Sequence, residues 1–333
     1  MTHTRGRALV LGATGHIGNA ITRDLLDNGY DVTAATRQQH PAALADLGVK
    51  IARGDSDRPG QLAAWVRGHT VVIDAAAPYP VNLFVATASA ERSPLDYARG
   101  RIGALVDAVA REGATLGYIS SFTTLPRPDA NGILAAIEAR TRRLLHPYFA
   151  VKAAMEEIVL EAARGGLRAA ILNPTACMGP WDRRPREQCV VPLLLTEQVP
   201  AMVARAVNVI DVRDVALAVR AAVEQQHFGA PIQLAGHDSR TDTLAARVCA
   251  FAGVPAPRLR VSARLVAGGA LWAEAAWALA GRPSPLPVIG QLLLLEGYPM
   301  RPSMGQRALG AMPRPLDETL RDSIAWYKQL GYY

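Results

Sequence analysis

Tyr148 and Lys152 are the residues of this 333-residue chain whose types and spacing most directly indicate acid–base chemistry. They lie four positions apart in "HPYFAVKAAMEEIVLE" (146–161), so on a helix their side chains share one face. An ammonium group beside a phenol favours the phenolate and lowers the pKa of the tyrosine from about 10 toward working pH. Such a tyrosine can give a proton to a substrate oxygen or take one from it. The chain contains only three lysines, which makes a lysine at this position informative.

Hydroxyl side chains follow a predicted strand in "YISSFTTL" (118–125). The candidates are Ser120, Ser121, Thr123 and Thr124. A hydroxyl at the carboxyl end of this strand can orient a substrate carbonyl and stabilise negative charge that develops on its oxygen. The residue types alone leave open which of the four does so.

Three glycines in "GATGHIG" (12–18) separate a predicted strand from a predicted helix. We expect Gly12 to allow the tight turn, Gly15 to let the backbone approach a pyrophosphate, and Gly18 to let the helix pack closely on the strand. The first N–H groups of the helix would then face the anion. The spacing is GxxGxxG, not the GxGxxG of many dehydrogenases, but its place between a strand and a helix indicates a dinucleotide site.

The end of the second predicted strand, "AATR" (34–37), bears on the choice of cofactor. An acidic residue here would bind the ribose 2′-hydroxyl of NAD, whereas the guanidinium of Arg37 can bind the 2′-phosphate of NADP. The alternative is a solvated surface arginine. Asp55, after the third predicted strand, could bond an adenine amine, cap the next helix, or do both. We therefore predict that NADP(H) is preferred and that NAD(H) is possible.

The elements that must position these residues alternate regularly over the first 175 residues. Apolar runs that read as strands alternate with amphipathic runs that read as helices, and this alternation predicts an α/β fold with a doubly wound parallel sheet, the Rossmann arrangement. We predict a nucleotide-binding core over 1–175 and a smaller, irregular substrate-binding region over 176–333, with about 205–236 returning to the core. The apolar stretches 265–281 and 286–297 are too short or too interrupted to span a membrane, so we expect buried helices there. The alternative is peripheral contact of this region with a membrane.

Composition excludes several other classes of protein. The net charge is +7, but the arginines are dispersed and no long basic block suggests nucleic acid. The three cysteines, Cys177, Cys189 and Cys249, show neither metal-ligand spacing nor a disulfide framework, so no metal site is predicted. The N-terminus runs straight into a strand pattern with no signal peptide, and we expect a cytoplasmic protein without stable membrane insertion.

Taken together, these motifs resemble the extended short-chain dehydrogenase/reductases. The nearest resemblance is to the NAD-dependent epimerase/dehydratase group, with its dihydroflavonol-reductase-like and 3β-hydroxysteroid-dehydrogenase-like members. Besides the glycine loop and "YFAVK", it rests on "ILNPTACMGP", "NVIDVRDVALAV" and "ETLRDSIAWY". The resemblance implies that Tyr148 is the acid/base, that Lys152 tunes its pKa and binds the nicotinamide ribose, and that Ser121 orients the substrate, with Thr123 as the alternative.

The resemblance also implies which residues contact the cofactor, and the sequence departs from the family pattern at two positions. Gly100 stands where the family often has an asparagine, which puts a proton relay through that side chain in doubt. His16 is expected near the pyrophosphate and not as a catalyst. The complete predicted cofactor site comprises Gly12, Thr14, Gly15, His16, Ile17, Gly18, Arg37, Asp55, Ser56, Ala75, Ala76, Ala77, Lys152, Asn173, Pro174 and Thr175.

The leading functional hypothesis is an NADPH-preferring oxidoreductase that reduces a ketone, or oxidises the corresponding secondary alcohol, of a sizeable apolar or aromatic small molecule. The alternative is an NAD-dependent nucleotide-sugar epimerase or dehydratase, whose diphosphate could be bound by Arg183, Arg184 and Arg186. A third hypothesis is a non-catalytic protein that senses NADP(H). The family also suggests a homodimer through the helices 101–113 and 148–164.

Overall fold

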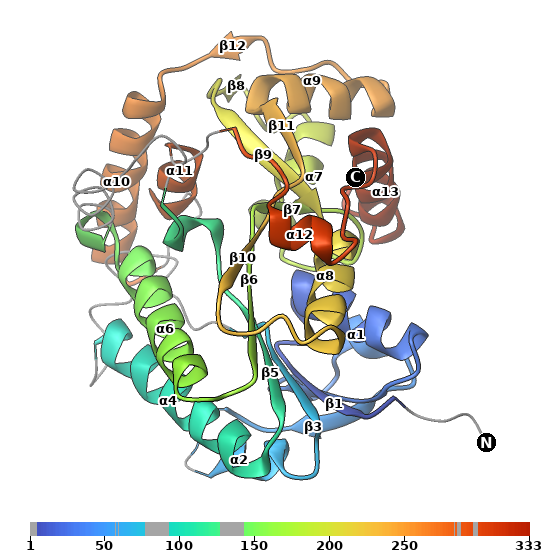
Figure 1. Cartoon of the computed structure of the whole chain (residues 1–333). Coiled ribbons are helices and arrows are strands. Elements are labelled where there is room, and N and C mark those ends of the chain that lie inside the picture. Colours follow the sequence, from blue (N-terminus) through green and yellow to red (C-terminus); the bar gives the residue numbers. More distant parts are fainter. Residues whose placement is uncertain are drawn as a thin grey trace.

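The computed structural model describes residues 5–56, 58, 60–76, 93–126, 143–282, 284, 288–295 and 299–333. Its centre is a parallel sheet of seven strands among these residues, in the order β10-β6-β5-β4-β1-β2-β3 (Figure 1). The strands are β1 (Arg7–Leu11), β2 (Asp31–Thr36), β3 (Lys50–Arg53), β4 (Val71–Asp74), β5 (Thr115–Ile119), β6 (Ala169–Pro174) and β10 (Pro231–Leu234). This order, running outward in both directions from β1, is that of a Rossmann sheet. The predicted fold class is therefore confirmed.

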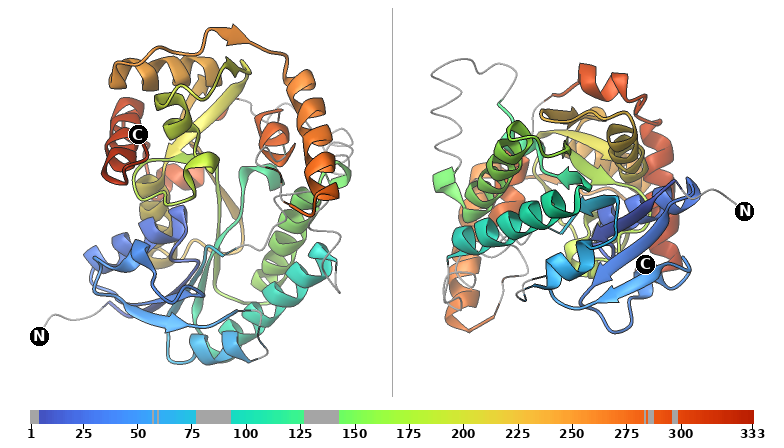
Figure 2. Two further views of the ribbon diagram at one scale, coloured as in Figure 1. Left: turned by 180° about the vertical axis from the view of Figure 1, so that it is seen from behind. Right: turned by 60° about the horizontal axis from the view of Figure 1, so that its bottom comes forward.

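Helices cover both faces of the sheet because its central strands are apolar on both sides. On one face lie α1 (His16–Asp27) and α8 (Val212–Glu224), which pack against each other and enclose a core containing Ile21, Val215 and Val219. On the other face lie α2 (Gln61–Val66), α4 (Pro94–Glu112) and α6 (Pro147–Arg164), around a core containing Leu105 and Met155. The two views of Figure 2 show the sheet between these layers.

The C-terminal half adds a smaller, irregular layer above the carboxyl ends of the strands (Figure 1). Its sheet has the order β11-β9-β7 and is built from β7 (Ala176–Met178), β9 (Ala206–Asp211) and β11 (His237–Arg240). The helices α7 (Val190–Leu195), α9 (Thr241–Ala252) and α13 (Leu316–Gln329) enclose a separate apolar core. From the segment 205–236, α8 packs on the central sheet and β10 extends it. The boundary at residue 176 stays a prediction.

Five short or peripheral elements belong to this half as well. They are β8 (Ala201–Met202) paired with β12 (Leu259–Arg260), then α10 (Ala263–Leu279), α11 (Val288–Leu295) and α12 (Met304–Ala308). The prediction of a buried helix over 265–281 is confirmed for the helix and wrong for its burial. The helix is present as α10, but Ala270 and Glu274 are its buried residues and most of its large apolar side chains are exposed.

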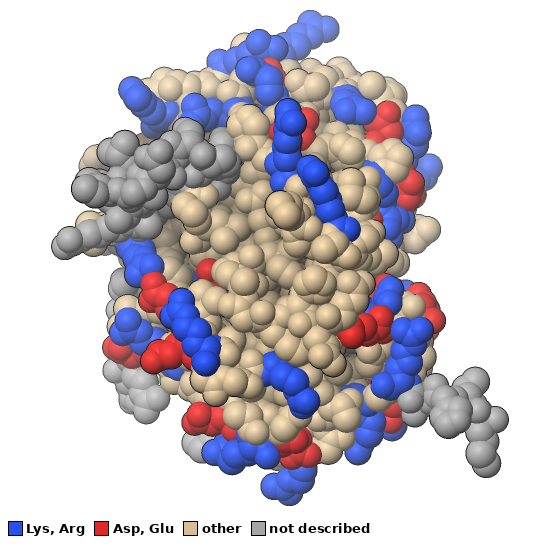
Figure 3. Space-filling view, in the orientation of Figure 1, with Lys and Arg blue, Asp and Glu red and all other residues tan. Residues whose placement is uncertain are grey.

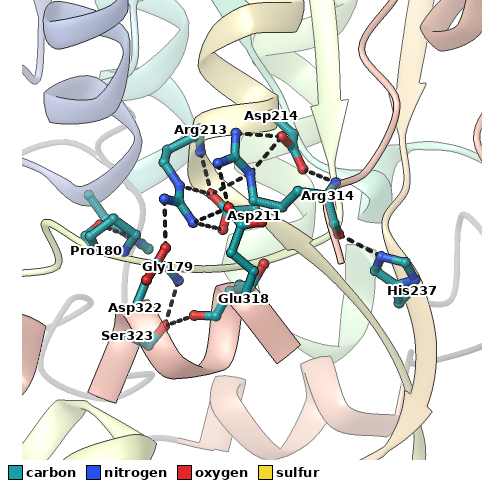
Figure 4. A network of polar contacts seen from close by, with 12 residues as sticks. Gly179, Pro180, Asp211, Arg213, Asp214, His237, Arg314, Glu318, Asp322 and Ser323 are labelled. Carbon is teal, nitrogen blue, oxygen red and sulfur yellow. Dashed lines mark hydrogen bonds and ion pairs between the residues drawn. The ribbon is translucent and has the colours of Figure 1, made fainter. Parts of the chain in front are cut away.

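A polar network fixes the start of α8 to the C-terminal elements (Figure 4). The side chain of Asp211 caps α8 by accepting a hydrogen bond from the backbone N–H of Arg213 at 2.8 Å. The Arg213 guanidinium pairs with Asp211 at 2.8 Å and with Asp322 of α13 at 2.7 Å. Arg314 pairs with Asp214 at 2.9 Å. These contacts hold the second layer over the edge of the sheet where the predicted site lies.

Candidate active site

Two cavities lie at the carboxyl ends of the central strands, on either side of the glycine loop. The first, which we name the Arg37 cavity, has a volume of about 280 Å³. The second, the Tyr148 cavity, has a volume of about 440 Å³. Gly12 and Thr14 line the Arg37 cavity, whereas His16, Ile17 and Gly18 line the Tyr148 cavity together with Gly15. The loop therefore connects two compartments that a dinucleotide could occupy together.

The glycine loop has room only for glycine at two of its three positions. Gly12 has a φ of +77°, and a Cβ added there would lie 2.7 Å from the carbonyl oxygen of Ala75. A Cβ on Gly18 would lie 2.1 Å from the carbonyl oxygen of Gly12. Gly15 is the N-cap of α1, which begins at His16, and no acidic residue occupies the first turn. The unpaired N–H groups at this helix start favour an anion at the junction of the two cavities.

The Arg37 cavity contains part of the predicted cofactor site. Arg37 is exposed and lines the cavity with Thr14, Ser56 and Ala76. Asp55 is not among its lining residues in the described part of the chain. The alternative that Asp55 caps the following helix is wrong, because α2 begins at Gln61 with Gly60 as its N-cap. Ala75 lines the Tyr148 cavity instead, and Ala77 lies outside the described residues.

A buried ion pair lies beneath the Arg37 cavity and was not predicted. The guanidinium of Arg101, on α4, donates to both carboxylate oxygens of Asp74, at the end of β4, over 2.9 and 2.7 Å. Both side chains are almost completely buried, 3 % and 1 % exposed. The sequence did carry a signal: Arg101 stands with Ala98, Ile102 and Leu105 at the helical spacing of a core face. Gly100, the residue at the family's asparagine position, is exposed.

The Tyr148 cavity brings together the three residues predicted as catalytic. Tyr148 and Lys152 come from α6, and Ser121 follows β5. The hydroxyl of Tyr148 lies 3.5 Å from Oγ of Ser121, and this Oγ also accepts a hydrogen bond of 2.9 Å from the hydroxyl of Thr123. Thr123 itself is not among the described residues that line the cavity. Ser121 is thus the hydroxyl placed beside the tyrosine.

The start of α6 is capped by a histidine that no sequence motif indicated. His146 is the N-cap, and its Nδ1 accepts a hydrogen bond of 3.1 Å from the backbone N–H of Tyr148. Burial lowers the pKa of His146 to about 4, so the ring is neutral near pH 7 and able to accept this bond. The cap fixes the first turn of the helix and with it the direction of the Tyr148 side chain.

Lys152 lies at the back of the cavity with 5 % of its surface exposed. Its Nζ donates to the carbonyl oxygen of Ile119 over 3.5 Å. Burial lowers the pKa of Lys152 to about 8, an effect that the carboxylates of Asp74 and Glu156 oppose and that Arg101 adds to. The buried pair Asp74–Arg101 and Lys152 therefore influence one another electrostatically, although the pair lies by the Arg37 cavity and Lys152 by the Tyr148 cavity.

Glu156 is a second buried charged residue that was not predicted. It follows Lys152 by four residues on α6 and is 6 % exposed. Its Oε2 accepts hydrogen bonds from Thr124 at 2.7 Å and from the side-chain amide of Asn173 at 2.6 Å. The same amide donates to the carbonyl oxygen of Ser121 at 3.0 Å. The sequence signal was the position of Glu156 on the face of α6 that also carries Tyr148, Lys152 and Met155.

Asn173 therefore lies behind the cavity and is not among the described residues that line it. Its predicted cofactor contact gains no support from this position, whereas the adjacent Pro174 and Thr175 do line the cavity. The remaining wall is mainly apolar and includes Phe122, Cys177, Val207, Leu293 and Met300. The polar groups on this side are Asn208 and Arg184.

The three arginines considered for a substrate diphosphate already have partners. Arg184 pairs with Asp182 at 2.6 Å, and this contact helps to hold the pKa of that carboxyl well below its usual range against the effect of burial. The guanidinium of Arg183 lies 5.2 Å from the ring centre of Trp326. Arg186 donates to the carbonyl oxygen of Tyr332 at 3.5 Å. Among the described residues, no group of three or more histidines, cysteines and acids is arranged to hold a metal ion.

Comparison with known proteins decides the family. The NAD dependent epimerase/dehydratase family matches residues 8–234, a span that includes the glycine loop, the Tyr148–Lys152 pair and β10. The chain belongs to this family. This epimerase/dehydratase-family protein is thus an NAD(P)-dependent oxidoreductase of the extended short-chain dehydrogenase/reductase type, and the resemblance inferred from its motifs is confirmed.

Two relatives match this chain over almost its whole length. A Synechocystis protein named dihydroflavonol 4-reductase is 26% identical over 97% of this chain and 95% of its own. The sterol demethylase protein B of Methylococcus capsulatus is 29% identical over 97% of this chain and 98% of its own. Among solved structures, a nucleoside-diphosphate-sugar epimerase from Pseudomonas aeruginosa has a TM-score of 0.72, with 22% identity and 99% and 100% of the two chains covered. That similarity supports the fold alone.

Proposed function

We propose that this protein is an NADPH-preferring oxidoreductase that reduces a ketone of a sizeable, apolar or aromatic small molecule, or oxidises the corresponding secondary alcohol. The observation that carries the proposal is the convergence of Tyr148, Ser121 and Lys152 on a cavity whose wall is mainly apolar. The region after residue 175 supplies one side of that wall, including Val207, Leu293 and Met300.

The residues at the glycine loop suit a nicotinamide dinucleotide. Gly12 and Gly18 leave no space for a side chain, and the start of α1 is free of acidic residues, so a pyrophosphate can approach the backbone there. The exposed guanidinium of Arg37, in the adjoining cavity, could pair with a 2′-phosphate, which is the basis of the preference for NADPH. A nicotinamide cofactor bound here supplies the hydride equivalent for the carbonyl carbon.

The protein's own residues manage the proton and the oxygen. In reduction, Tyr148 donates its phenolic proton to the substrate oxygen while negative charge develops there. Ser121 donates a hydrogen bond to the same oxygen, and its Oγ is oriented for this by the hydroxyl of Thr123. The cationic form of Lys152 stabilises the phenolate that remains on Tyr148. In oxidation the same groups act in reverse.

The size and apolar character of the proposed substrate rest on the cavity wall and on the names of the relatives. A cavity of about 440 Å³ with Phe122, Leu293 and Met300 in its wall suits a molecule that buries much apolar surface. The relatives' names refer to a dihydroflavonol and to sterols, both compact polycyclic classes.

A nucleotide-sugar epimerase or dehydratase is the second candidate, favoured by the solved structures that share the fold. Such a substrate needs cationic groups for its diphosphate. Arg184 lines the Tyr148 cavity, but its guanidinium is held by Asp182, and Arg183 and Arg186 have contacts elsewhere. We therefore rank this candidate second, and a non-catalytic NADP(H) sensor third, because the catalytic residues converge on one cavity. A cytoplasmic location and a homodimer through 101–113 and 148–164 remain predictions.

The test is to incubate the purified protein with NADPH or NADH and a panel of polycyclic and aromatic ketones, following the nicotinamide absorbance. We expect oxidation of NADPH that Tyr148→Phe slows by roughly 10²- to 10⁴-fold. Tyr30→Phe, which removes the hydroxyl that donates to Glu224, serves as the matched control. Interconversion of a UDP-sugar with tightly bound NAD would support the second candidate instead.

Cofactor preference is tested separately with Arg37→Ala. We expect the KM for NADPH to rise roughly 10- to 100-fold, because a charge-assisted bond to the phosphate is lost, with little change for NADH. Arg53→Ala is the control, since Arg53 is exposed on the neighbouring strand β3 and lines neither cavity among the described residues. Equal KM values for the two cofactors in the wild type would refute the preference without affecting the proposed reaction.

A further inference from the structure

Helix α10 presents a stripe of apolar side chains to solvent. Leu265, Trp272 and Leu279 are spaced seven residues apart and therefore share one face of the helix. Their exposed fractions are 76 %, 79 % and 92 %. At 1.5 Å per residue the stripe is roughly 20 Å long. An exposed apolar stripe of this kind on an outer helix is typical of a surface that binds another protein or a membrane.

The exposed charges on the segment that carries the stripe are all of one sign, although one of them, Arg260, pairs with Asp242 of α9 at 3.1 Å. Arg258, Arg260 and Arg264 precede or begin α10, Arg282 follows it, and all four are exposed. Glu274 is the only acidic residue between positions 254 and 282. It is 2 % exposed and accepts a hydrogen bond of 2.6 Å from the backbone N–H of Val288 at the start of α11. The exposed charges on this segment are thus arginines at both ends of an apolar stripe.

The position of α10 in the molecule leaves this face accessible. Both views of Figure 2 place α10 at the outer edge, and α11 lies between it and the rest of the structure (Figure 1). Basic side chains gather along the edge of the molecule at β12, which leads into α10 (Figure 3). Within the described segments, none of the helices has both the length and the apolar character that a bilayer span requires. A helix of this type can lie in the plane of a membrane surface instead.

We propose that α10 docks the protein onto an anionic membrane surface. Leu265, Trp272 and Leu279 enter the boundary between headgroups and acyl chains, where a tryptophan side chain is well accommodated. The flanking arginines contact acidic headgroups at the two ends of the helix. The inner face of α10 stays packed on α11, so docking needs no rearrangement of the fold.

A second copy of the chain is a poorer occupant of the stripe. In an antiparallel pair of α10 helices, the arginines before one helix would meet Arg282 of the other, and in a parallel pair arginine clusters would face each other. No exposed acidic residue lies on 258–282 to offset this repulsion. An anionic lipid surface satisfies the apolar stripe and the arginines at the same time.

The experiment is co-sedimentation of the full chain with two kinds of vesicle. One contains phosphatidylcholine alone, and the other also contains about 30% of the anionic lipid phosphatidylglycerol. We expect binding to the anionic vesicles that weakens as salt is raised. Trp272→Asp/Leu279→Asp should abolish it. Met304→Asp/Met312→Asp is the matched control, because both methionines are exposed, at 86 % and 57 %, and lie outside α10.

A second pair of variants separates a local site from the general positive charge of the protein. Arg258→Ser/Arg264→Ser should weaken binding to anionic vesicles roughly 10- to 30-fold. Arg99→Ser/Arg111→Ser, which removes two exposed arginines from α4, should leave binding nearly unchanged. No binding to anionic vesicles, or equal losses in the two arginine pairs, would overturn the proposal. So would light scattering that shows a wild-type dimer and a monomeric Trp272→Asp/Leu279→Asp variant. These results do not depend on the proposed reaction.

Discussion

The hydroxyl of Tyr148 lies 3.5 Å from Oγ of Ser121, although the two residues are 27 positions apart and belong to different elements. Ser121 Oγ also accepts the hydroxyl hydrogen of Thr123, which leaves the serine hydroxyl hydrogen directed toward another acceptor. In the proposed reaction that acceptor is the substrate oxygen, beside the proton donor Tyr148.

This relationship predicts different roles for the two neighbouring hydroxyls. Ser121→Ala should lower kcat roughly 10²- to 10³-fold, because it removes a donor to the reacting oxygen. Thr123→Ala removes only the group that orients Ser121, so the loss in kcat should be much smaller. Steady-state kinetics of both variants under the same conditions make the comparison. The larger loss in Thr123→Ala would show that the threonine is the catalytic hydroxyl.

Glu156 gives a prediction for the pH profile. Its carboxylate raises the pKa of Lys152, against the effect of burial. The activity of the wild type should decline as Lys152 loses its proton near pH 8. Glu156→Gln should lower the pKa of Lys152, so the activity of this variant should decline at a lower pH. The loss of a well-aligned acceptor for Thr124 and Asn173 should also reduce kcat several-fold.

The matched control is the next residue on the same helix. Glu157 is exposed and pairs with Arg143 at 2.5 Å. Glu157→Gln should leave both kcat and the pH profile unchanged. An identical alkaline limb in Glu156→Gln and the wild type would contradict the electrostatic role assigned to Glu156.

Lys152 should also reduce the stability of the folded protein. Its pKa falls from 10.5 to about 8 on folding, so the unfolded chain binds more protons between these two pH values. The contribution of Lys152 to the free energy of unfolding is therefore unfavourable at pH 7 and becomes less so as pH rises through this window. Lys152→Met should be more stable than the wild type at pH 7, by at most about 3 kcal/mol.

Urea unfolding at several pH values checks this expectation. The advantage of Lys152→Met should shrink from pH 8 upward and vanish near pH 10.5. Lys50→Met provides the comparison, because Lys50 has a side chain 64 % exposed and pairs with Asp31 at the surface. A difference between Lys152→Met and the wild type that is constant with pH would disprove the linkage.

The buried pair Asp74–Arg101 should depend strongly on both partners. Arg101→Met leaves a buried carboxylate without its cation and should lower the free energy of unfolding by roughly 3–5 kcal/mol. The double variant Asp74→Asn/Arg101→Met should be less destabilised than Arg101→Met alone, because no uncompensated charge remains. Unfolding in urea measures both, and the exposed pair Lys50–Asp31 should show coupling below about 1 kcal/mol in the same double-mutant cycle. Additive effects at Asp74 and Arg101 would contradict the prediction.

Local spacing was enough to predict the parts of the site that lie on one element. Tyr148 and Lys152 are brought together by the geometry of a single helix turn, and Gly12 and Gly18 by a single loop. The parallel sheet followed from the alternation of strands and helices, and with it the arrival of Ser121 beside α6. These inferences needed no knowledge of contacts between distant residues.

The charges behind the site were harder to predict, because their meaning depends on such distant contacts. Arg101 and Glu156 each stand at a core position of an amphipathic helix, but their spacing does not reveal the partners, Asp74 and Asn173, that make burial tolerable. Helix α10 was misjudged for a related reason. Its apolar sequence predicts that the side chains of this helix are buried. The sequence alone does not say whether they pack into the protein's own core or against a separate surface.

The glycine loop has a consequence for how this enzyme can diversify. Among the described residues, the Arg37 cavity and the Tyr148 cavity share no lining residue. In the proposed function, substitutions that change the adenosine phosphate recognised would therefore fall on β2 and its neighbours, whereas those that admit a different substrate would fall on the apolar wall of the Tyr148 cavity, such as Phe122, Val207 and Leu293. Each property can change in evolution, or be redesigned, while the other is retained.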